Sequence, residues 1–326
     1  MTAAVASAGI RDNPWLSFAG RRLGRFVVSL WVLASTAFLM IQLVPGDPVR
    51  AALGMTAPVE LVNARRQALG LDDPLWVQYG HYLRGLFTGD FGTSMSSGLP
   101  VAQVIGDRLP GTLKLAVLAF AVVVVVAVPV GVVFAVLTRG GRRRGVELGF
   151  TSTTVLLAAV PEFLVAVGLV ALFAVALGWF PVAGRGDASA FVLPVAALAI
   201  GPAAVLSRVV RVEMLSVLGN DFIRTARAKR LPARLVYVRH ALPNALTATL
   251  TLGGLMLTGM VAGTVLVENV FAWPGLGSTI VQSILQKDYP LVQGIVLVYG
   301  VGVLLVNLVI DVLLALLDPR STIRES

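Results

Sequence analysis

The stretch that decides the fold is LKLAVLAFAVVVVVAVPVGVVFAVL, residues 113–137, an apolar run whose only charge is Lys114. A helix needs about 20 such residues to cross the roughly 30 Å of hydrocarbon in a bilayer. Five further apolar stretches of similar length lie on either side of it, at residues 23–44, 148–177, 191–218, 245–267 and 291–317. We therefore predict an all-α membrane protein with six transmembrane helices.

The overall composition agrees with this prediction and excludes other classes. Of the 326 residues, 57% are hydrophobic and 13% are charged, whereas about a quarter of a soluble domain is charged. The net charge of +9 does not indicate nucleic-acid binding, because the basic residues lie between apolar runs. The chain has no cysteine and only two distant histidines, His81 and His240, so we expect no disulfide and no bound metal.

The distribution of basic residues predicts the orientation. If the amino terminus is cytoplasmic, 18 of the 26 Lys and Arg residues fall on the cytoplasmic side, and the other side holds eight basic and nine acidic residues. This asymmetry follows the positive-inside rule. The first apolar run lacks an A-x-A cleavage pattern, so we expect it to be retained as a span. Both termini are then cytoplasmic.

These spans divide the chain into segments. The predicted segments are a cytoplasmic amino-terminal segment (1–22), the first helix (23–44), an external segment (45–111), a core of five helices (112–317) and a cytoplasmic tail (318–326). Within the external segment, Leu75, Tyr79, Tyr82, Leu83 and Leu86 have helical spacing. We expect a helix there that lies against the membrane or against the other spans.

The basic loop between the fourth and fifth spans carries the main chemical signal. It begins with Asn220 and Asp221, which are good N-cap residues, and continues with helix formers. Pro232 disfavours helical backbone in the residue before it, so one short helix should end there and a second should begin near Ala233. A short helix of this kind suits docking into a groove of another protein. A basic loop can equally anchor the topology beside anionic lipid.

The loop resembles the EAA loop of binding-protein-dependent ABC importer permeases, in the form typical of the dipeptide, oligopeptide and nickel branch. There, a pattern like Y-x-R-T-A-R-A-K-G-L precedes H-A-L-x-N-A-L, and this chain has FIRTARAKRL at 222–231 and HALPNAL at 240–246. The family glycine is replaced by Arg230. A non-glycine residue in the left-handed conformation that ends a helix costs on the order of 1 kcal/mol. Whether Arg230 takes that conformation or Pro232 supplies the break is left open.

The resemblance extends over almost the whole chain after about residue 20. The further blocks that carry it are LVPGDP (43–48), LGLDDP (69–74), GDFGTS (89–94), RLPGT (108–112), ENVFAWPGLG (268–277) and DYPLVQG (288–294). Taken together, they resemble the first of the two permeases of dipeptide and oligopeptide systems.

This resemblance implies a fold, a function and a set of partners. The fold is that of type I ABC importer permeases, with a cytoplasmic coupling helix between helices 4 and 5, in the bacterial plasma membrane. The implied partners are a second permease, one or two ABC ATPases, an extracytoplasmic solute-binding protein and membrane lipid, but no nucleic acid. The implied substrates are dipeptides or oligopeptides, with nickel as the alternative. ATP and Mg²⁺ belong to the ATPases; without a G-x-x-x-x-G-K-[ST] motif, this chain should bind no cofactor and be non-catalytic.

The resemblance assigns one group of residues to ATPase coupling. This group is Asp221, Phe222, Arg224, Thr225, Ala226, Arg227, Ala228, Lys229, Arg230 and Leu231. We expect Ala226 to provide a small face that fits the partner's groove.

Two further groups are candidates for the transport path. Residues suited to an external gate or docking surface are Pro45, Gly46, Asp47, Pro48, Trp273, Pro274 and Gly275, with a purely shape-determining role as the alternative. Glu162 in the third span is a candidate for the substrate path, because a bare carboxylate there costs about 2.5 kcal/mol or more. A structural carboxyl near a broken helix is the alternative. For Asp311 we favour helix packing over transport.

Two other classes compete with the importer. A self-sufficient secondary transporter usually has intramembrane charges, broken helices in both halves and an inverted repeat; we find no repeat. An intramembrane enzyme would need a catalytic pair within the spans, and both histidines lie outside them.

Overall fold

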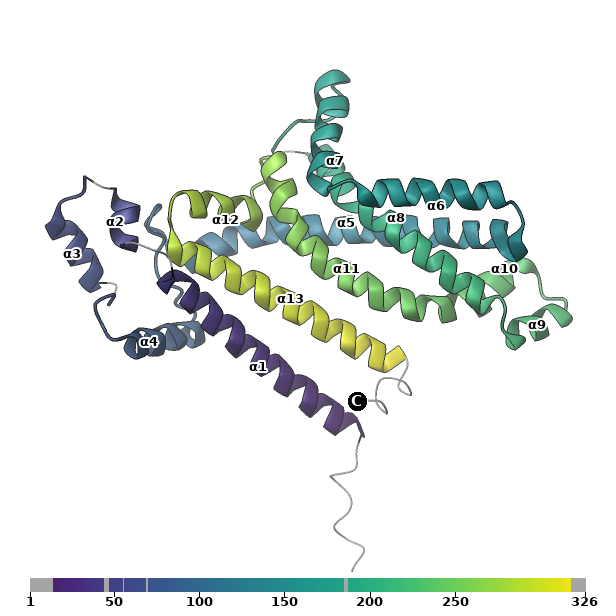
Figure 1. The fold of residues 1–326 in the computed structure, drawn as a ribbon, viewed down its shortest axis with the longest axis horizontal. Coiled ribbons are helices and arrows are strands. Elements are labelled where there is room, and N and C mark those ends of the chain that lie inside the picture. Colours follow the sequence, from purple (N-terminus) through teal and green to yellow (C-terminus); the bar gives the residue numbers. More distant parts are fainter. Residues whose placement is uncertain (1–13, 44–46, 55, 69, 185–186, 318–326) are drawn as a thin grey trace, which may run out of the picture.

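The computed structural model describes residues 14–43, 47–54, 56–68, 70–184 and 187–317, and these ranges are almost wholly helical (Figure 1). In chain order the α-helices are α1 (Pro14–Gln42), α2 (Pro48–Leu53), α3 (Val59–Ala68), α4 (Leu75–Thr88), α5 (Val101–Thr138), α6 (Arg144–Ala159), α7 (Glu162–Leu169), α8 (Val192–Val217), α9 (Asp221–Ala228), α10 (Ala233–Leu235), α11 (Leu242–Val270), α12 (Leu276–Leu285) and α13 (Tyr289–Leu317). The prediction of an all-α protein is confirmed.

Within the described ranges, five helices are long and apolar enough to cross a membrane. They cover Ala19–Gln42, Val101–Gly141, Ala188–Val217, Thr249–Val270 and Tyr289–Leu313. A sixth crossing exists if α6 and the helical stretch Glu162–Ala176, which meet at 93°, count as one broken span. The 16 residues of α6 measure about 24 Å at 1.5 Å per residue, which is too short for the whole hydrocarbon layer.

The third predicted span, 148–177, is therefore two helices that meet at a bend. Pro161 has no amide hydrogen to donate and disfavours helical backbone in Val160, whose φ and ψ are −77° and 123°. The chain turns at this point, and α7 projects from the bundle in Figure 1. Hydropathy alone does not distinguish a bent apolar segment from a straight one.

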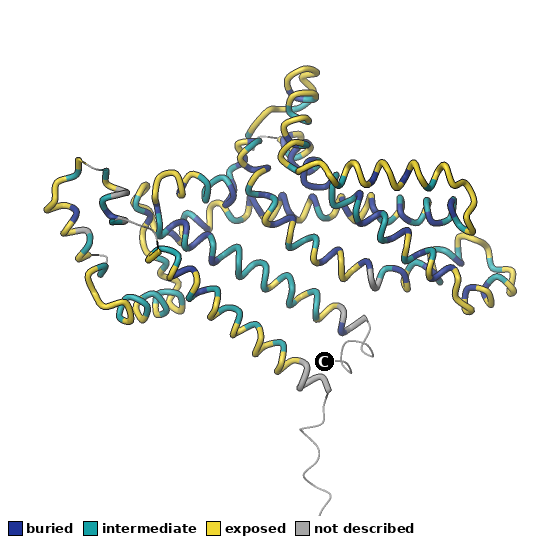
Figure 2. Tube along the Cα trace, in the orientation of Figure 1, coloured by how far each residue is buried: buried dark blue, intermediate teal, exposed yellow. Residues whose placement is uncertain are grey.

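The centre of the molecule is formed by α5, α8 and α11, where buried residues concentrate (Figure 2). Helices α5 and α8 approach closely at Gly131. A methyl group built on Gly131 would lie 2.6 Å from the carbonyl oxygen of Ser207 and from the Cβ atom of Val210. Only glycine allows this approach without a shift of the backbone.

Helix α5 begins before the second predicted span. Helix α5 starts at Val101 and continues through Pro110, whereas we expected the external segment to reach residue 111. The first turns are held because Val101 and Ile105 are buried against Leu276 and Leu291. This contact joins the start of α5 to α12 and α13.

The two ends of the bundle differ in what they carry. Figure 1 places α2, α3, α4 and α12 toward one end, and the start of α1, the end of α13 and α9 toward the other.

An ion pair between Arg22 of α1 and Asp311 of α13 joins these two helices. The helix-packing role favoured for Asp311 is confirmed.

Candidate functional sites at the two ends of the bundle

The short helix that we predicted in the basic loop exists as α9 and is held to the bundle by one apolar face. Ile223 and Ala226 are buried, in a cluster with Met214 and Leu218 at the end of α8 and Val236 after α10. The prediction of a second helix beginning at Ala233 is also confirmed. Helix α9 therefore rests directly on the end of α8.

The other face of α9 is the one available to a partner. Its exposed residues are Asp221, Phe222, Arg224, Thr225, Ala228, Lys229 and Arg230. We call this set the coupling face. Phe222 is an apolar side chain among basic ones and is 44% exposed. Our expectation that Ala226 meets the partner is wrong, because its methyl group packs inside this chain.

Arg230 takes the left-handed conformation that glycine has in the family pattern. Its φ is 55°. The amide of Arg230 donates to the carbonyl of Arg227 at 2.9 Å, and the amide of Leu231 donates to that of Ala226 at 3.3 Å. These two bonds form a Schellman motif. The turn keeps its usual shape, at a cost of about 1 kcal/mol for the side chain of Arg230.

One buried arginine on α8 connects three helices near α9. The Nε and Nη2 atoms of Arg211 donate to Thr138 Oγ1 at 3.1 and 3.0 Å, and Nη2 also donates to Glu147 Oε1 at 2.7 Å. The arginine thus joins α8 to the end of α5 and the first turn of α6, one turn from Met214. Our sequence reasoning missed this site. The signal was an arginine inside an apolar run, together with polar residues where two neighbouring spans end.

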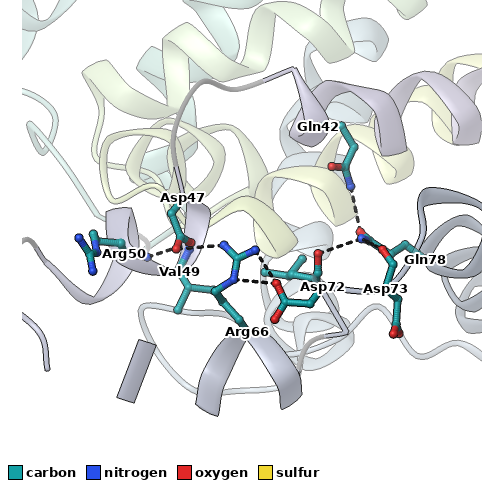
Figure 3. Close-up of polar contacts among 9 residues, drawn as sticks. Gln42, Asp47, Val49, Arg50, Arg66, Asp72, Asp73 and Gln78 are labelled. Carbon is teal, nitrogen blue, oxygen red and sulfur yellow. Dashed lines mark hydrogen bonds and ion pairs between the residues drawn. The ribbon is translucent and has the colours of Figure 1, made fainter. Parts of the chain in front are cut away.

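At the opposite end, Asp47 is the centre of a polar network (Figure 3). Its Oδ1 accepts from the amides of Val49 and Arg50 and caps α2, and its Oδ2 pairs with Arg66 Nη1 at 3.0 Å. The other side of the Arg66 guanidinium binds Asp72 Oδ1, at 2.6 Å from Nη2. Burial raises the pKa of Asp47, but the hydrogen bonds from Arg66 and the two amides outweigh it, so the pKa lies below its ordinary value.

This network joins the LVPGDP and LGLDDP blocks. Pro48 occupies the first turn of α2, where the missing amide hydrogen is tolerated. Pro45 and Gly46, which we also assigned to a gate or docking surface, lie outside the described residues. A role for this segment in docking stays a prediction.

Asp288 fills a second buried site at this end. Its carboxylate accepts from the hydroxyls of Ser94 and Ser96 and from the amides of Met95 and Ser96, the two amides at 3.0 and 3.1 Å. Burial raises the pKa of Asp288, but these hydrogen bonds lower it by more, so the pKa lies below its ordinary value. The GDFGTS and DYPLVQG blocks meet here.

Glu268 forms the third site and is fully buried. Oε1 accepts from Thr112 Oγ1 at 2.7 Å, and Oε2 accepts from the amide of Ser278 at 3.0 Å in the first turn of α12. A methyl group built on Gly277 would lie 2.9 Å from Oε2. The carboxylate therefore holds the start of α12 against α5 and joins the RLPGT and ENVFAWPGLG blocks.

The residues after Glu268 have a shape-determining role. Trp273 is fully buried, its Nε1 donates to the carbonyl of Gly111 at 3.3 Å, and its ring meets Phe191 edge-on with centroids 4.6 Å apart. Gly275 is also buried, and Pro274 is half-buried. Our docking interpretation is wrong for Trp273 and Gly275, because neither has an exposed surface. A role in a gate stays a prediction.

Glu162 is the first residue of α7, directly after the 93° bend. It is half-buried, and its carboxylate occupies the space beside Gly263 of α11 where a side chain at that position would begin. No hydrogen bond or ion pair to this carboxylate occurs within the described part of the chain. The substrate-path assignment of Glu162 stays a prediction. In the same ranges, no three His, Asp or Glu side chains converge as ligands for a metal.

The described helices thus form a bundle of membrane-length spans, with a short exposed helix toward one end and hydrogen-bonded turns toward the other. The family of binding-protein-dependent transport system inner membrane components matches residues 127–323, and its amino-terminal counterpart matches residues 15–116. The chain belongs to this family. It is the multi-pass permease subunit of an ATP-driven import system, as the resemblance implied. A self-sufficient secondary transporter is excluded.

Named relatives match over nearly their full length. A protein of Brucella suis biovar 1 (strain 1330), provisionally named as a peptide transport system permease, is 39% identical over 308 residues, covering 92% of this chain and 97% of its own. The glutathione transport system permease protein GsiC of Salmonella typhimurium (strain LT2) is 37% identical over 305 residues, covering 93% of this chain and 98% of its own. An inward-facing structure of the MetNI methionine ABC transporter matches with a TM-score of 0.56 at 17% identity, covering 66% of this chain and 97% of its own, and supports the fold alone.

Proposed function

We propose that this chain is one of two permeases in an importer of short peptides. The observation that carries the proposal is the match, at 37–39% identity and over nearly full length, to relatives named for peptide and glutathione transport. Glutathione is itself a tripeptide, so both names describe one class of substrate. The proposed substrates are dipeptides or oligopeptides taken from an extracytoplasmic binding protein.

In this proposal the coupling face of α9 docks an ATPase subunit, which binds ATP and Mg²⁺, and the permease catalyses no reaction itself. Phe222 would enter an apolar pocket while the basic residues around it pair with acidic groups. Movement of α9 would pass to α8 through the contacts of Ile223 and Ala226 with Met214 and Leu218. Arg211 would then carry the movement from α8 to α5 and α6.

The proposed orientation places α9 and both termini in the cytoplasm. The segment containing α2, α3 and α4 is then external, where the binding protein delivers substrate. The distribution of basic residues supports this orientation, since the dense basic loop lies on the α9 side. A reporter fused after Arg144 should read as cytoplasmic, and one fused near Thr93 as external.

The test is to purify the chain in mild detergent from its own host and to measure ATP hydrolysis by the assembly. Peptide-loaded binding protein should stimulate hydrolysis, and two ATPases and a second permease should copurify. Stimulation by a nickel chelate and not by peptides would favour the nickel alternative. A chain that purifies alone and has no associated ATPase would contradict the proposal.

A matched pair of variants tests the coupling face. Phe222→Glu should abolish copurification of the ATPase, because it places a carboxylate where an apolar contact is proposed. The control is Leu61→Glu, which alters a similarly exposed apolar residue (52% against 44%) at the other end of the molecule. Equal ATPase recovery from both variants would show that α9 is not the docking element.

A further inference from the structure

We propose that α4 is an interfacial helix whose outward face binds the headgroup region of anionic phospholipids, in the leaflet on the side of α2–α4. The outward face comprises Trp76, Gly80, Arg84 and Phe87, which recur every three or four residues and so form one stripe along the helix. All four are exposed, and the two aromatic side chains are among the most exposed apolar residues described, Trp76 at 76% and Phe87 at 91%. This proposal does not depend on the substrate of the importer.

The opposite side of α4 packs on α1. Ser35 and Tyr79 share a hydrogen bond of 2.7 Å between their hydroxyls, and the Phe38 ring meets the Tyr79 ring edge-on with centroids 5.2 Å apart. Gln42 Nε2 donates to Gln78 Oε1 at 3.1 Å (Figure 3). These contacts fix which face of α4 turns away from the protein.

The contacts also place α4 at a depth in the bilayer. They extend from Ser35 to Gln42, the last residue of the span, which corresponds to about 10 Å along the axis of α1. Helix α4 therefore lies beside the end of the membrane-crossing helix and not beyond it. An interfacial helix enters the boundary between headgroups and acyl chains by about 5–10 Å, which is the same depth.

The lipid-facing surface of α1 continues onto α4. Trp31 and Leu39 lie one turn to either side of Ser35 on the same stripe of α1, and both are exposed. Because α4 contacts Ser35 and leaves Trp31 and Leu39 exposed, lipid that contacts these two residues also meets α4. The outward face is thus an extension of an apolar membrane surface.

The chemistry of the outward face suits an anionic headgroup. Trp is enriched at membrane interfaces because its ring is apolar and its N–H is polar. Arg84 lies between the two aromatic residues, and a guanidinium can bind phosphate oxygens through two parallel hydrogen bonds. No ion pair to Arg84 occurs within the described ranges, and the stripe has no acidic residue. The excess positive charge favours an anionic phospholipid over a zwitterionic one.

The absence of cysteine in the chain makes a depth measurement direct. Trp76→Cys and Phe87→Cys, in the full chain with its copurifying subunits, would be spin-labelled in nanodiscs of phosphatidylcholine and phosphatidylglycerol. Accessibility to oxygen, which concentrates in lipid, would be compared with accessibility to a water-soluble nickel chelate. Val28→Cys on the lipid-exposed side of α1 and Leu61→Cys on α3 provide the lipid and water references.

Both α4 labels should be more accessible to oxygen than the Leu61 label and less so than the Val28 label. If they match the Leu61 label, α4 faces water. If they are shielded from both reagents, the face is covered by protein. Either result overturns the proposal.

The headgroup preference has its own test. Raising the phosphatidylglycerol fraction should raise the midpoint of thermal unfolding for the native chain and for Arg84→Lys, and this shift should be at least halved in Arg84→Glu. An equal shift in Arg84→Glu would show that the outward face does not recognise anionic headgroups.

Discussion

The two ends of this permease are held together in different ways. At the end that carries α2–α4 and α12, carboxylates hold segments together that are far apart in the chain, as Glu268 does for Thr112 and Asp288 does for Ser94. At the other end, α9 is held by the apolar side chains of Ile223 and Ala226 and by one strained turn. Hydrogen-bonded carboxylates tolerate little displacement, whereas apolar contacts can slide. The difference agrees with the proposed function, in which the end that carries α2–α4 is external and α9 moves with the ATPase.

The largest expected effect on stability comes from removing a buried carboxylate at the end that carries α2–α4 and α12. Glu268→Ala leaves the hydroxyl of Thr112 and the amide of Ser278 without their acceptor, and should cost about 3 kcal/mol or more of stability. Glu60→Ala, at an exposed position of α3, is the control. Thermal unfolding in detergent measures both, and a Glu268→Ala midpoint equal to that of the control would contradict the comparison.

The effect of Asp288→Asn should be somewhat smaller, about 2 kcal/mol at neutral pH, because its hydrogen bonds involve a charged acceptor. The pKa of Asp288 is lowered in the folded protein, so its contribution is present above the unfolded value, near pH 4, and is lost as the pH falls through the folded value. Stability measured from pH 6 to pH 2 should therefore fall more steeply for the native chain than for Asp288→Asn. Parallel stability curves for the two proteins would contradict this prediction.

At the end that carries α9, Arg211→Met should cost about 1–2 kcal/mol, since its partner Glu147 is partly exposed and solvent weakens the pair. A double-mutant cycle with Glu147→Gln should give a coupling energy of about 1 kcal/mol. If Arg211 carries movement from α8 to α5 and α6, Arg211→Met should also lower peptide uptake per ATP hydrolysed. If Arg211→Met lowers stability but leaves peptide uptake per ATP hydrolysed unchanged, Arg211 has only a structural role.

The smallest expected effect is a gain in stability. Arg230→Gly should stabilise the loop by about 1 kcal/mol, because glycine adopts a φ of 55° without strain. Lys229→Gly is the matched control, since Lys229 has a φ of −74° and gains nothing from glycine. Hydrogen exchange of the α9 amides would detect the change. Equal exchange in the two variants would show that the turn is not strained.

Several of our expectations followed directly from local chemistry. The short helix ended before Pro232, the second one began at Ala233, and the helix predicted from Leu75 to Leu86 exists as α4. Others failed because they depend on contacts with distant parts of the chain. Ala226 was expected to face a partner, but which side of α9 is buried depends on where α8 ends. Trp273 was expected near a docking surface, but it packs against Phe191 and Gly111.

The sequence by itself determined the membrane class, the positions of the apolar segments, the short helix in the basic loop and the family, because hydropathy, helix capping and motif spacing are properties of short segments. Only the tertiary structure decided how the motif blocks pair, since the contacts of Glu268 and Asp288 join residues 156 and 194 positions apart. It also decided that the third span bends and that Arg230 takes a positive φ. The physical reason is that burial and hydrogen-bond partners depend on how helices pack together, which no local pattern specifies.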